Sequence, residues 1–420
     1  MKIRMNKKAL LSFVLFLTIT FSGFAQLNIS GEFRPRLEYR NGYMKLLNED
    51  QSPETLIHQR ARINFNHKTQ LAEFNLSAQD VRAWGEEKIL VDNNSFSVYE
   101  AWAQFQLNEQ LQIKAGRQEL VYDDERLLSR RNWHNFGATY DMLLLKHQND
   151  VQQFHIGAGY NNEKWNSWWA TPYDLDFFKS LSFLWYKRQL GAINASAIGI
   201  LELNEKEEST DLYGRFTYGT NLDYKVAENS VSLQGTFYHQ VGTETDGTSI
   251  NAFMFSSGVK WKYHNKHAFG ITLDYLSGTD ETDLNNTKNK TFHKLNGAFH
   301  KFYGYMELFP INQQGGLLDF YLRLSGSALK GKYQISWHQF SLPNNVLDPV
   351  DIGVEPKVLD KDLGSELDLM YDISFKQGFG LKFNYSFFLA QDSYKKLVNK
   401  VDAKDFSSFA SLMLIYKFKN

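Results

Sequence analysis

The amino-acid sequence predicts one transmembrane antiparallel β-barrel of about 18 strands, an all-β fold. Three observations predict this class. Apolar and polar residues alternate over runs of about 10–14 residues, the length that a tilted strand needs to cross a bilayer. Short turns and long polar segments alternate between these runs. After the first 25 residues, no apolar stretch is long enough for a membrane-spanning helix, so only a closed barrel could cross a membrane.

The composition excludes several classes of protein. Of the 420 residues, 43% are hydrophobic, 15% aromatic and 22% charged, which is too polar for a helical membrane protein and too aromatic for a disordered chain. The absence of cysteine excludes disulfides, thiolate metal sites and cysteine nucleophiles. The 46 Lys and Arg residues nearly balance the 47 Asp and Glu residues, so the charge gives no indication of a nucleic-acid partner.

The start of the chain has the pattern of a secretory signal peptide. Four basic residues precede an apolar run at 9–21, which is too short to cross a bilayer comfortably. Gly23 and Ala25 then fit signal-peptidase cleavage after residue 25. We expect residues 1–25 to be removed and residues 26–420 to form a single barrel domain. A retained N-terminal anchor is the alternative.

The first predicted strand shows the two-faced pattern most clearly. From Leu27 to Arg40, the odd positions are largely apolar and every even position is polar. A strand with one apolar and one polar face fits a wall between lipid and water. Taken along the chain, the same reasoning predicts strands at 27–40, 59–69, 72–82, 97–107, 110–118, 138–148, 151–160, 178–188, 192–203, 211–225, 229–241, 250–263, 267–278, 315–327, 330–341, 362–376, 379–390 and 405–419.

The connections alternate in length. Tight turns, such as 70–71 and 377–378, are separated by longer segments that are polar or rich in tryptophan. In an outer-membrane barrel only the outward-facing loops are free to grow, so we expect periplasmic turns and extracellular loops. The long segments 119–137 and 279–314 should therefore lie on the cell surface or fold inward from it.

Several strings of residues resemble the alginate export family of outer-membrane barrels. The matching strings are Gly116–Leu128 (GRQELVYDDERLL), Arg130–Trp133 (RRNW), Tyr140–Leu143, His300–Phe309 (HKFYGYMELF), Leu363–Leu369 and Asn384–Ser386. The resemblance implies a cell outer membrane of the Gram-negative type, with outer-membrane lipids and the outer-membrane assembly machinery as partners. It also implies passive passage of an anionic polysaccharide, such as alginate or its oligomers, through a pore lined by arginines.

The polar strand faces explain such a pore physically. The lumen of a barrel of about 18 strands holds water, and arginine pairs with carboxylates through a planar fork that stays charged. The predicted pore-lining or substrate-contacting residues are Arg34, Arg36, Arg60, Arg62, Arg117, Arg126, Arg130, Arg131 and Arg323. Their predicted acidic partners in the lumen are Glu32, Glu38, Glu100, Glu366 and Asp368. The alternative for each arginine is a structural ion pair within the wall.

Four loop tryptophans are candidates for stacking on sugar rings: Trp133, Trp165, Trp168 and Trp169. Packing within the loops is the alternative. The histidine pairs lack zinc-ligand spacing, and the acidic run Asp280–Asp283 fits a solvated loop better than a calcium site. We expect no metal, no cofactor and no enzymatic activity. Two functional alternatives stay open: a general porin for small anions or nutrients, and a barrel enzyme or adhesin that acts through its loops.

Overall fold

The computed structural model describes residues 26–86, 95–163, 170, 173, 177–226, 230–264, 266–309, 314–351, 353 and 357–420. The predicted signal peptide at 1–25 lies outside the described residues. None of the described helices is long and apolar enough to cross a membrane.

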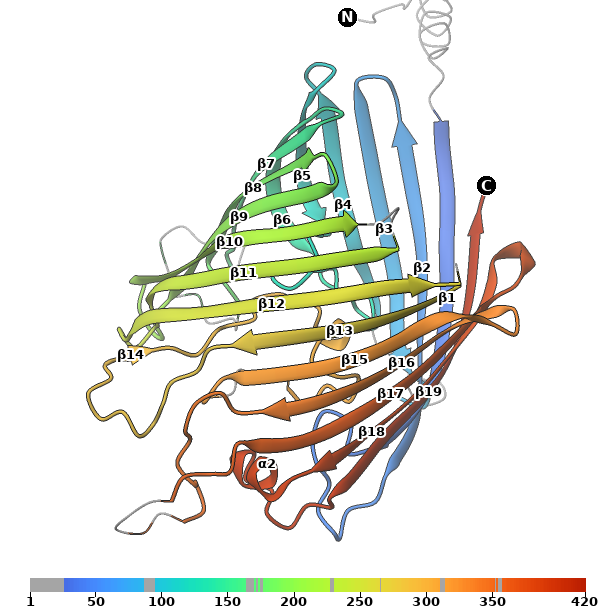
Figure 1. Ribbon diagram of the computed structural model, residues 1–420. Helices are drawn as coiled ribbons and strands as arrows, with labels where there is room; N and C mark the ends of the chain where they lie inside the picture. The colour runs from blue at the N-terminus through green and yellow to red at the C-terminus, as the bar shows by residue number, and fades with distance from the viewer. Residues whose placement is uncertain are drawn as a thin grey trace, which may run out of the picture.

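Eighteen long antiparallel strands form one closed barrel (Figure 1). Each long strand pairs with its neighbours in the chain, and β1 pairs with both β2 and β19, which closes the cylinder. A two-residue strand, β14, pairs in parallel with the start of β12. The long strands β13 and β15 pair directly with each other. The predicted fold class is confirmed.

The long strands are β1 Gln26–Asn41, β2 Glu54–Lys68, β3 Ala72–Ala83, β4 Phe96–Gln106, β5 Leu111–Gln118, β6 Tyr140–Gln148, β7 Gln152–Tyr160, β8 Ser180–Leu190, β9 Ile193–Glu205, β10 Leu212–Val226, β11 Val231–Thr243, β12 Ser249–Tyr263, β13 His267–Leu276, β15 Leu317–Ala328, β16 Gly331–Ser341, β17 Asp362–Ser374, β18 Phe379–Ala390 and β19 Phe406–Lys419. The short elements are β14 Lys288–Asn289, η1 Phe299–Lys301, η2 Lys376–Gly378 and α2 Asp392–Leu397. The strand β2 begins at Glu54, earlier than predicted, because it stays paired with β1 as far as Arg40.

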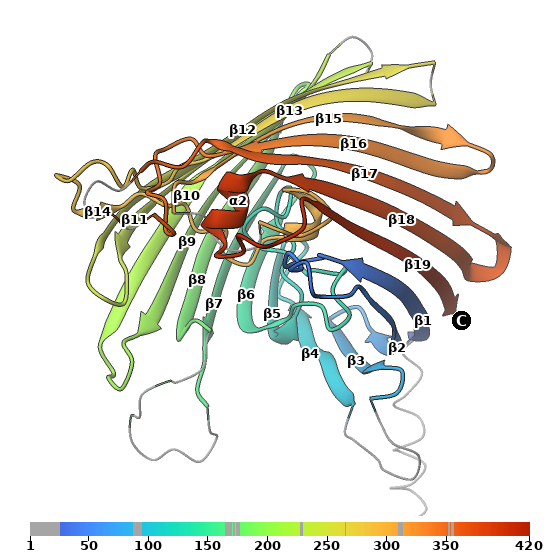
Figure 2. The ribbon, with the colours of Figure 1, turned by 90° about the horizontal axis from the view of Figure 1, so that it is seen from below.

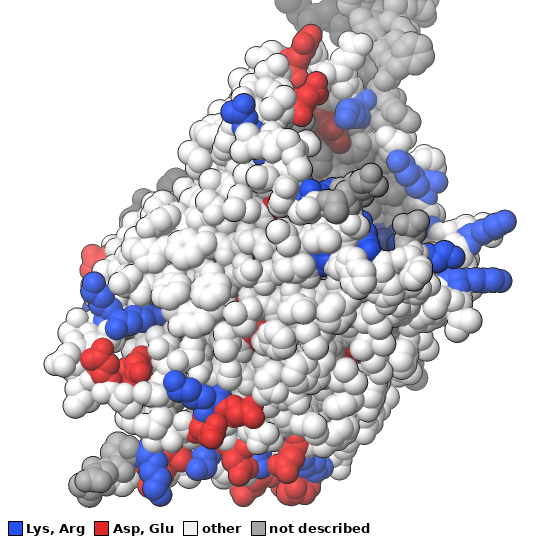
Figure 3. All heavy atoms as spheres, viewed as in Figure 1, with Lys and Arg blue, Asp and Glu red and all other residues white. Residues whose placement is uncertain are grey.

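The alternation of the sequence separates an outward face from a lumen face. In β1, Phe33 and Leu37 are about two-fifths exposed on the outside, whereas Arg34 and Arg36 are buried on the inside. Figure 3 shows that the charged side chains on this face of the molecule gather towards the two ends of the barrel. The broad band between them is almost uncharged, as lipid contact requires.

Two long connections fold into the barrel over much of their length. We call residues 119–139, between β5 and β6, the first inner loop, and residues 277–309, after β13, the second inner loop. Figure 2, a view into the barrel, shows the first inner loop and the later part of the second inside the ring of strands, whereas the segment next to β14 lies outside it. They pair with each other through a bridge between Leu128 and Asn296 and through a hydrogen bond from the Ala298 amide to the Glu125 carbonyl (2.9 Å).

The hydrophobic core lies inside the lumen, where these loops meet the wall. Its loop residues include Leu120, Leu127, Leu128, Phe292, Met306 and Phe309, and its wall residues include Leu144, Leu181, Phe340 and Phe388. Apolar residues therefore take part of the lumen face, which in a fully water-filled barrel would be polar. The helix α2 adds to this core, since the Tyr394 hydroxyl donates to the Leu308 carbonyl (2.8 Å).

Candidate functional site

Three of the predicted arginines fasten the first inner loop to the wall. Arg34, Arg36 and Arg60 project from the adjacent strands β1 and β2, and each is no more than 4% exposed. Their hydrogen bonds run from Arg34 Nη1 to Asn132 O (2.8 Å), Arg36 Nη1 to Trp133 O (2.9 Å), Arg60 Nη1 to Asn135 O (3.2 Å) and Arg60 Nη2 to Asn132 Oδ1 (2.9 Å). Backbone carbonyls of the loop thus bind the guanidinium groups that we expected to contact a solute.

Two carboxylates on β1 balance the charges of these arginines. Glu32 pairs with Arg60, and Glu38, which is completely buried, pairs with Arg36 (2.5 Å) and Arg40 (2.5 Å). A buried guanidinium is tolerated only when its charge and its donors are both satisfied.

Arg62 is held differently from its neighbours. Its guanidinium donates to Gln79 Oε1 (2.7 Å) and lies over the ring of Tyr99, 3.3 Å from the ring centroid. A long contact to the Phe136 carbonyl (3.5 Å) ties it weakly to the first inner loop. Arg62 thus belongs to the same anchoring region.

Arg126 fastens the first inner loop to the opposite wall. Its two terminal nitrogens each donate to one oxygen of Asp274 in β13 (2.8 Å), and Nη2 also donates to Ser256 Oγ in β12 (3.1 Å). Burial opposes the charge of Arg126, but the nearby Asp274 carboxylate and Tyr303 hydroxyl outweigh it and raise the Arg126 pKa well above its ordinary value.

Arg131 and Arg130, both in the first inner loop, differ in their contacts and exposure. Arg131 Nε donates to the Gly297 carbonyl of the second inner loop (3.0 Å), whereas Arg130 is about half exposed and lies 3.7 Å from Glu119. Arg323 lies on the lumen wall and donates to Ser336 Oγ (3.0 Å).

Arg117 departs from the prediction, because it lies on the outward face of β5. It forms an ion pair with Asp141 on β6 (2.8 Å), and both side chains are about half exposed. The next residues along these strands, Gln118 and Met142, are buried towards the lumen, and side chains alternate along a strand. The string Gly116–Gln118 shows no clear alternation of apolar and polar residues, so the sequence did not determine the face on which Arg117 lies.

The other predicted acidic residues hold loops and the wall rather than arginines. Glu366 Oε1 accepts from the Met306 amide (2.8 Å) in the second inner loop. Asp368 lies 3.6 Å from His338, which also contacts Asp319 (2.9 Å). Glu100 accepts from the Trp102 indole (3.1 Å) and the Glu119 amide (3.2 Å).

Trp133 lies at the junction of the two inner loops. Its ring stacks on His300 (3.8 Å between centroids, 1° between planes), and the Arg36 guanidinium carbon lies 4.2 Å from its centroid. His300 in turn stacks on Tyr305 (4.5 Å). The ring therefore contacts protein groups already, and its sugar-stacking role stays a prediction. Trp165, Trp168 and Trp169 lie outside the described residues.

A cavity of about 990 Å³, the loop-side cavity, lies near the strand ends that carry the long loops. Its cationic lining residues are Arg36, Arg40, Arg82, Arg130, Arg131 and Lys301, and its acidic ones are Glu86, Glu125 and Glu307. Cations therefore outnumber carboxylates around it.

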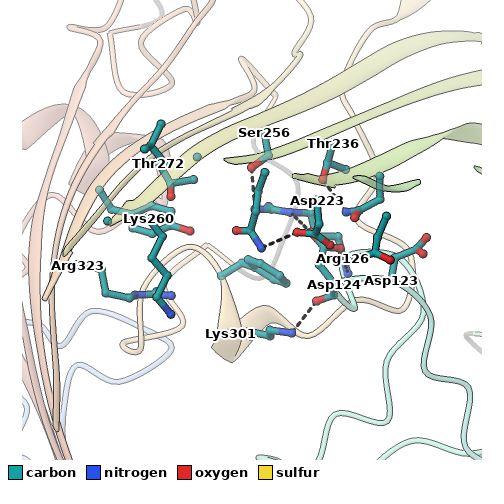
Figure 4. Close-up of a pocket in the computed structure, with 18 of the residues that line it drawn as sticks. Asp123, Asp124, Arg126, Asp223, Thr236, Ser256, Lys260, Thr272, Lys301 and Arg323 are labelled. Carbon is teal, nitrogen blue, oxygen red and sulfur yellow. Dashed lines mark hydrogen bonds and ion pairs between the residues drawn. The ribbon is translucent and has the colours of Figure 1, made fainter. Parts of the chain in front are cut away.

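A second cavity of about 430 Å³, the turn-side cavity, lies nearer the short turns (Figure 4). Its cationic residues are Arg126, Lys187, Lys260, Lys301 and Arg323, and its acidic ones are Asp123, Asp124 and Asp223. In Figure 4, Lys260 and Arg323 come from the barrel wall, whereas Arg126 and Lys301 come from the inner loops.

The sequence analysis missed Lys187 and Lys301. The alternation of β8 contained a signal for Lys187, which shares the inward face of Phe183 and Trp185, but that face reads as apolar because it packs on the first inner loop. Lys301 follows no periodic pattern, since it ends η1 within an irregular segment.

No group of three or more His, Asp or Glu side chains is arranged to hold a metal ion within the part of the chain that the structure describes. Carboxylates of the acidic run at 280–283 already accept hydrogen bonds from backbone amides of loops. Asp280 Oδ1 accepts from the Thr282 amide (2.9 Å), and Glu281 Oε2 accepts from the Leu347 amide (2.7 Å).

A closed 18-stranded barrel with an apolar outer face, and with cavities inside it where cations outnumber carboxylates, defines an outer-membrane channel. The profile of one family, described as "Alginate export", matches residues 25–312, well over half of the sequence. The chain belongs to the alginate export family, which places it in the outer membrane of a Gram-negative-type bacterium. Family and fold together point to transport rather than catalysis.

Solved structures of outer-membrane proteins share the fold. Acinetobacter baumannii OccAB1 is 13% identical over 95% of this chain and 98% of its own, with a TM-score of 0.64. Pseudomonas aeruginosa OccK5 (OpdH) is 12% identical over 94% of this chain and 98% of its own, with a TM-score of 0.62. Such low identity establishes the architecture alone. A search of curated proteins gave no match.

Proposed function

We propose that this barrel is a passive channel that favours anions and passes carboxylated saccharides, namely an anionic polysaccharide such as alginate or its oligomers. The lumen arginines contribute mainly by shaping the path, since several of them hold the first inner loop. In this proposal the apolar outer face contacts outer-membrane lipids, and the assembly machinery inserts the barrel.

One observation carries the proposal: the turn-side cavity presents cations without carboxylate partners. Among the described residues, Lys187, Lys260 and Arg323 form no ion pair, although all three line this cavity. By contrast, Asp123 accepts from Trp185 Nε1 (2.8 Å), and Asp223 accepts from Gln234 (3.0 Å). Asp123 and Asp223 thus accept from neutral donors, while Lys187 and Lys260 are exposed and Arg323 donates only to a neutral hydroxyl, which favours an anion in the cavity.

The proposal is tested by solute entry into vesicles that contain the purified barrel. A uronic-acid disaccharide should enter faster than a neutral disaccharide of the same size. Replacing Lys187, Lys260 and Arg323 together by Gln should remove this difference, whereas Lys288→Gln, an exposed loop substitution, should not. Equal entry of the charged and neutral sugars into vesicles with the unaltered protein would refute the proposal.

A second candidate is a porin for small anions, and the inner loops favour it. They pack against each other and against both walls, and residues of both loops line each of the two cavities. A size series of uronate oligomers distinguishes the candidates. Entry of the monomer alone would support the small-anion porin, and entry of long oligomers would support passage of a polymer.

A further inference from the structure

Lys301 occupies a special position, because its side chain lines both the loop-side and the turn-side cavity. It is the last residue of η1, and its side chain is about half exposed. In Figure 4 the ammonium group points towards the first inner loop at Asp124. A solute that moves between the cavities by the shortest path therefore passes this side chain.

The described contacts of the Lys301 ammonium group are two polar ones and one with the Phe302 ring, 5.5 Å from the ring centroid. Nζ donates to the Asp124 carbonyl (2.8 Å) and lies 3.3 Å from Glu125 Oε1. An ion pair this exposed contributes little to stability, and lysine keeps a long flexible stem. The ammonium group can therefore leave Glu125 for another carboxylate at little cost.

Glu125, in contrast, is fixed. Its other carboxylate oxygen accepts from the Ser129 hydroxyl (2.9 Å), and its backbone carbonyl accepts from the Ala298 amide (2.9 Å). Its backbone has a positive φ of 73°, a conformation that this tight segment imposes. The mobile partner of the pair is Lys301.

The loop segments on both sides of Lys301 are held in place by other contacts. Arg126 is adjacent to Glu125 in sequence and is bound to both oxygens of Asp274, which is completely buried. On the other side, Arg131 holds the Gly297 carbonyl (3.0 Å). Both loop segments beside Lys301 are thus anchored, so a side-chain movement is the cheapest way to join the cavities.

We infer that Lys301 is the specificity-determining residue of the channel: it releases Glu125 to pair with the carboxylate of a passing solute, and so transfers that solute between the two cavities. This inference rests on the proposed function and names the residue at which the anion is selected. The solutes that fit are those with separate carboxylates that can pair one at a time, such as short uronate oligomers.

The test is the reversal potential of single channels in a potassium chloride gradient. Lys301→Gln should move it by about half of its distance from zero, because one of the cations next to the path is lost. Lys301→Arg should keep the value of the unaltered channel, and Lys288→Gln is the matched control. A reversal potential in Lys301→Gln equal to that of the unaltered channel would overturn the inference.

A second variant keeps the inference testable if Lys301→Gln fails to fold. Glu125→Gln removes the competing carboxylate, so galacturonate should reduce the ion current at a several-fold lower concentration than in the unaltered channel. No change in that concentration would contradict the exchange. If the unaltered channel itself shows no preference for anions, the proposed function fails and this inference fails with it. If the unaltered channel prefers anions but both variants behave as it does, the inference alone fails.

Discussion

Arg126 shows how a single residue fixes an irregular loop inside the barrel. Its guanidinium binds both oxygens of Asp274, and Nε binds Asp124 Oδ2 (2.9 Å) within the loop itself. Both members of the Arg126–Asp274 pair are shielded from water. Removing one would leave the other as an uncompensated buried charge, which is the costly case.

Arg126→Gln should therefore lower the free energy of unfolding by about 3–5 kcal/mol. Urea titration of the barrel in lipid vesicles measures this change. The control is Arg130→Gln, which removes an exposed, long ion pair to Glu119 and should cost less than about 1 kcal/mol. Similar losses in the two variants would show that the Arg126–Asp274 pair does not anchor the loop.

Lys294, in the second inner loop, gives the protein a predictable dependence on pH. Burial lowers the pKa of Lys294 from its ordinary value of 10.5 to about 7. Its ammonium donates to the Phe309 carbonyl within the same loop. Between pH 7 and 10 the unfolded chain holds this proton more firmly than the folded one, so stability should increase with pH.

The expected slope is at most about 1.4 kcal/mol per pH unit, because one proton is involved. Urea titrations at pH 7, 8, 9 and 10 measure it, and Lys294→Met should flatten the curve over this range. An increase in Lys294→Met as steep as that in the unaltered protein would mean that another group causes the dependence.

At the scale of elements, β1 and β2 act together as an anchor for the first inner loop. Adjacent strands present Arg34, Arg36 and Arg60 on one face, and the loop supplies carbonyls at 132–135. An anchoring role and a pore-lining role lead to different electrical consequences. Releasing the loop would widen the path, whereas removing lining charges would change ion preference alone.

Replacing Arg34, Arg36 and Arg60 by Gln should increase single-channel conductance and add fluctuations to the current, because the loop loses its charged donors. Planar-bilayer recording gives both quantities. The control, Arg82→Gln, changes an arginine that lines the loop-side cavity but belongs to the outward face of β3, where it is paired with Gln59 and alternates with the buried Val81. Unchanged conductance with a shifted reversal potential in the triple variant would instead assign these arginines to the pore lining.

The long connections should face the cell exterior. The segment around Leu284 projects from the loop end of the barrel, and Leu284 is 94% exposed. A peptide tag inserted at Asn285 should bind its antibody on intact cells, whereas a tag at Leu329, in a short turn, should bind only after the outer membrane is permeabilised. The reverse labelling pattern would invert the orientation.

The strands were predictable because a membrane wall imposes a simple rule. One face meets lipid and the other meets the lumen, so a period of two extends over the whole of each crossing, as in β1. The predicted bounds were wrong where this rule weakens: at the start of β2, from Glu54, the apolar residues Leu56 and Ile57 are adjacent and do not alternate with polar ones. Charge types on lumen faces were predictable as well.

The roles of those charges were not predictable, because they depend on contacts between distant segments. Arg126 and Asp274 are 148 positions apart, and nothing in the sequence of the first inner loop indicates that it turns inward to meet β13. Likewise, the carbonyls that occupy Arg34 and Arg36 have no side-chain signature. The alternation of apolar and polar residues predicts on which face of the barrel wall a side chain lies. The contacts that side chains make inside the lumen depend on tertiary packing.

At the scale of the whole molecule, the barrel is a wall and the inner loops are the selective element. The loops bury their apolar side chains in the lumen and leave two cavities in which cations outnumber carboxylates. The net charge of the chain, −1, therefore conceals a strong local bias. Since carboxylates elsewhere in the chain offset these cations, ion preference should follow the cavities and not the net charge.

The most direct test of this account is the reversal potential of the unaltered, purified channel in a tenfold gradient of potassium chloride across a planar bilayer. Chloride has no specific chemistry in common with a saccharide, so the measurement reports the field of the lumen alone. The account predicts a potential whose sign shows that chloride is more permeant than potassium. A potential of zero, or of the opposite sign, would contradict an anion-favouring lumen.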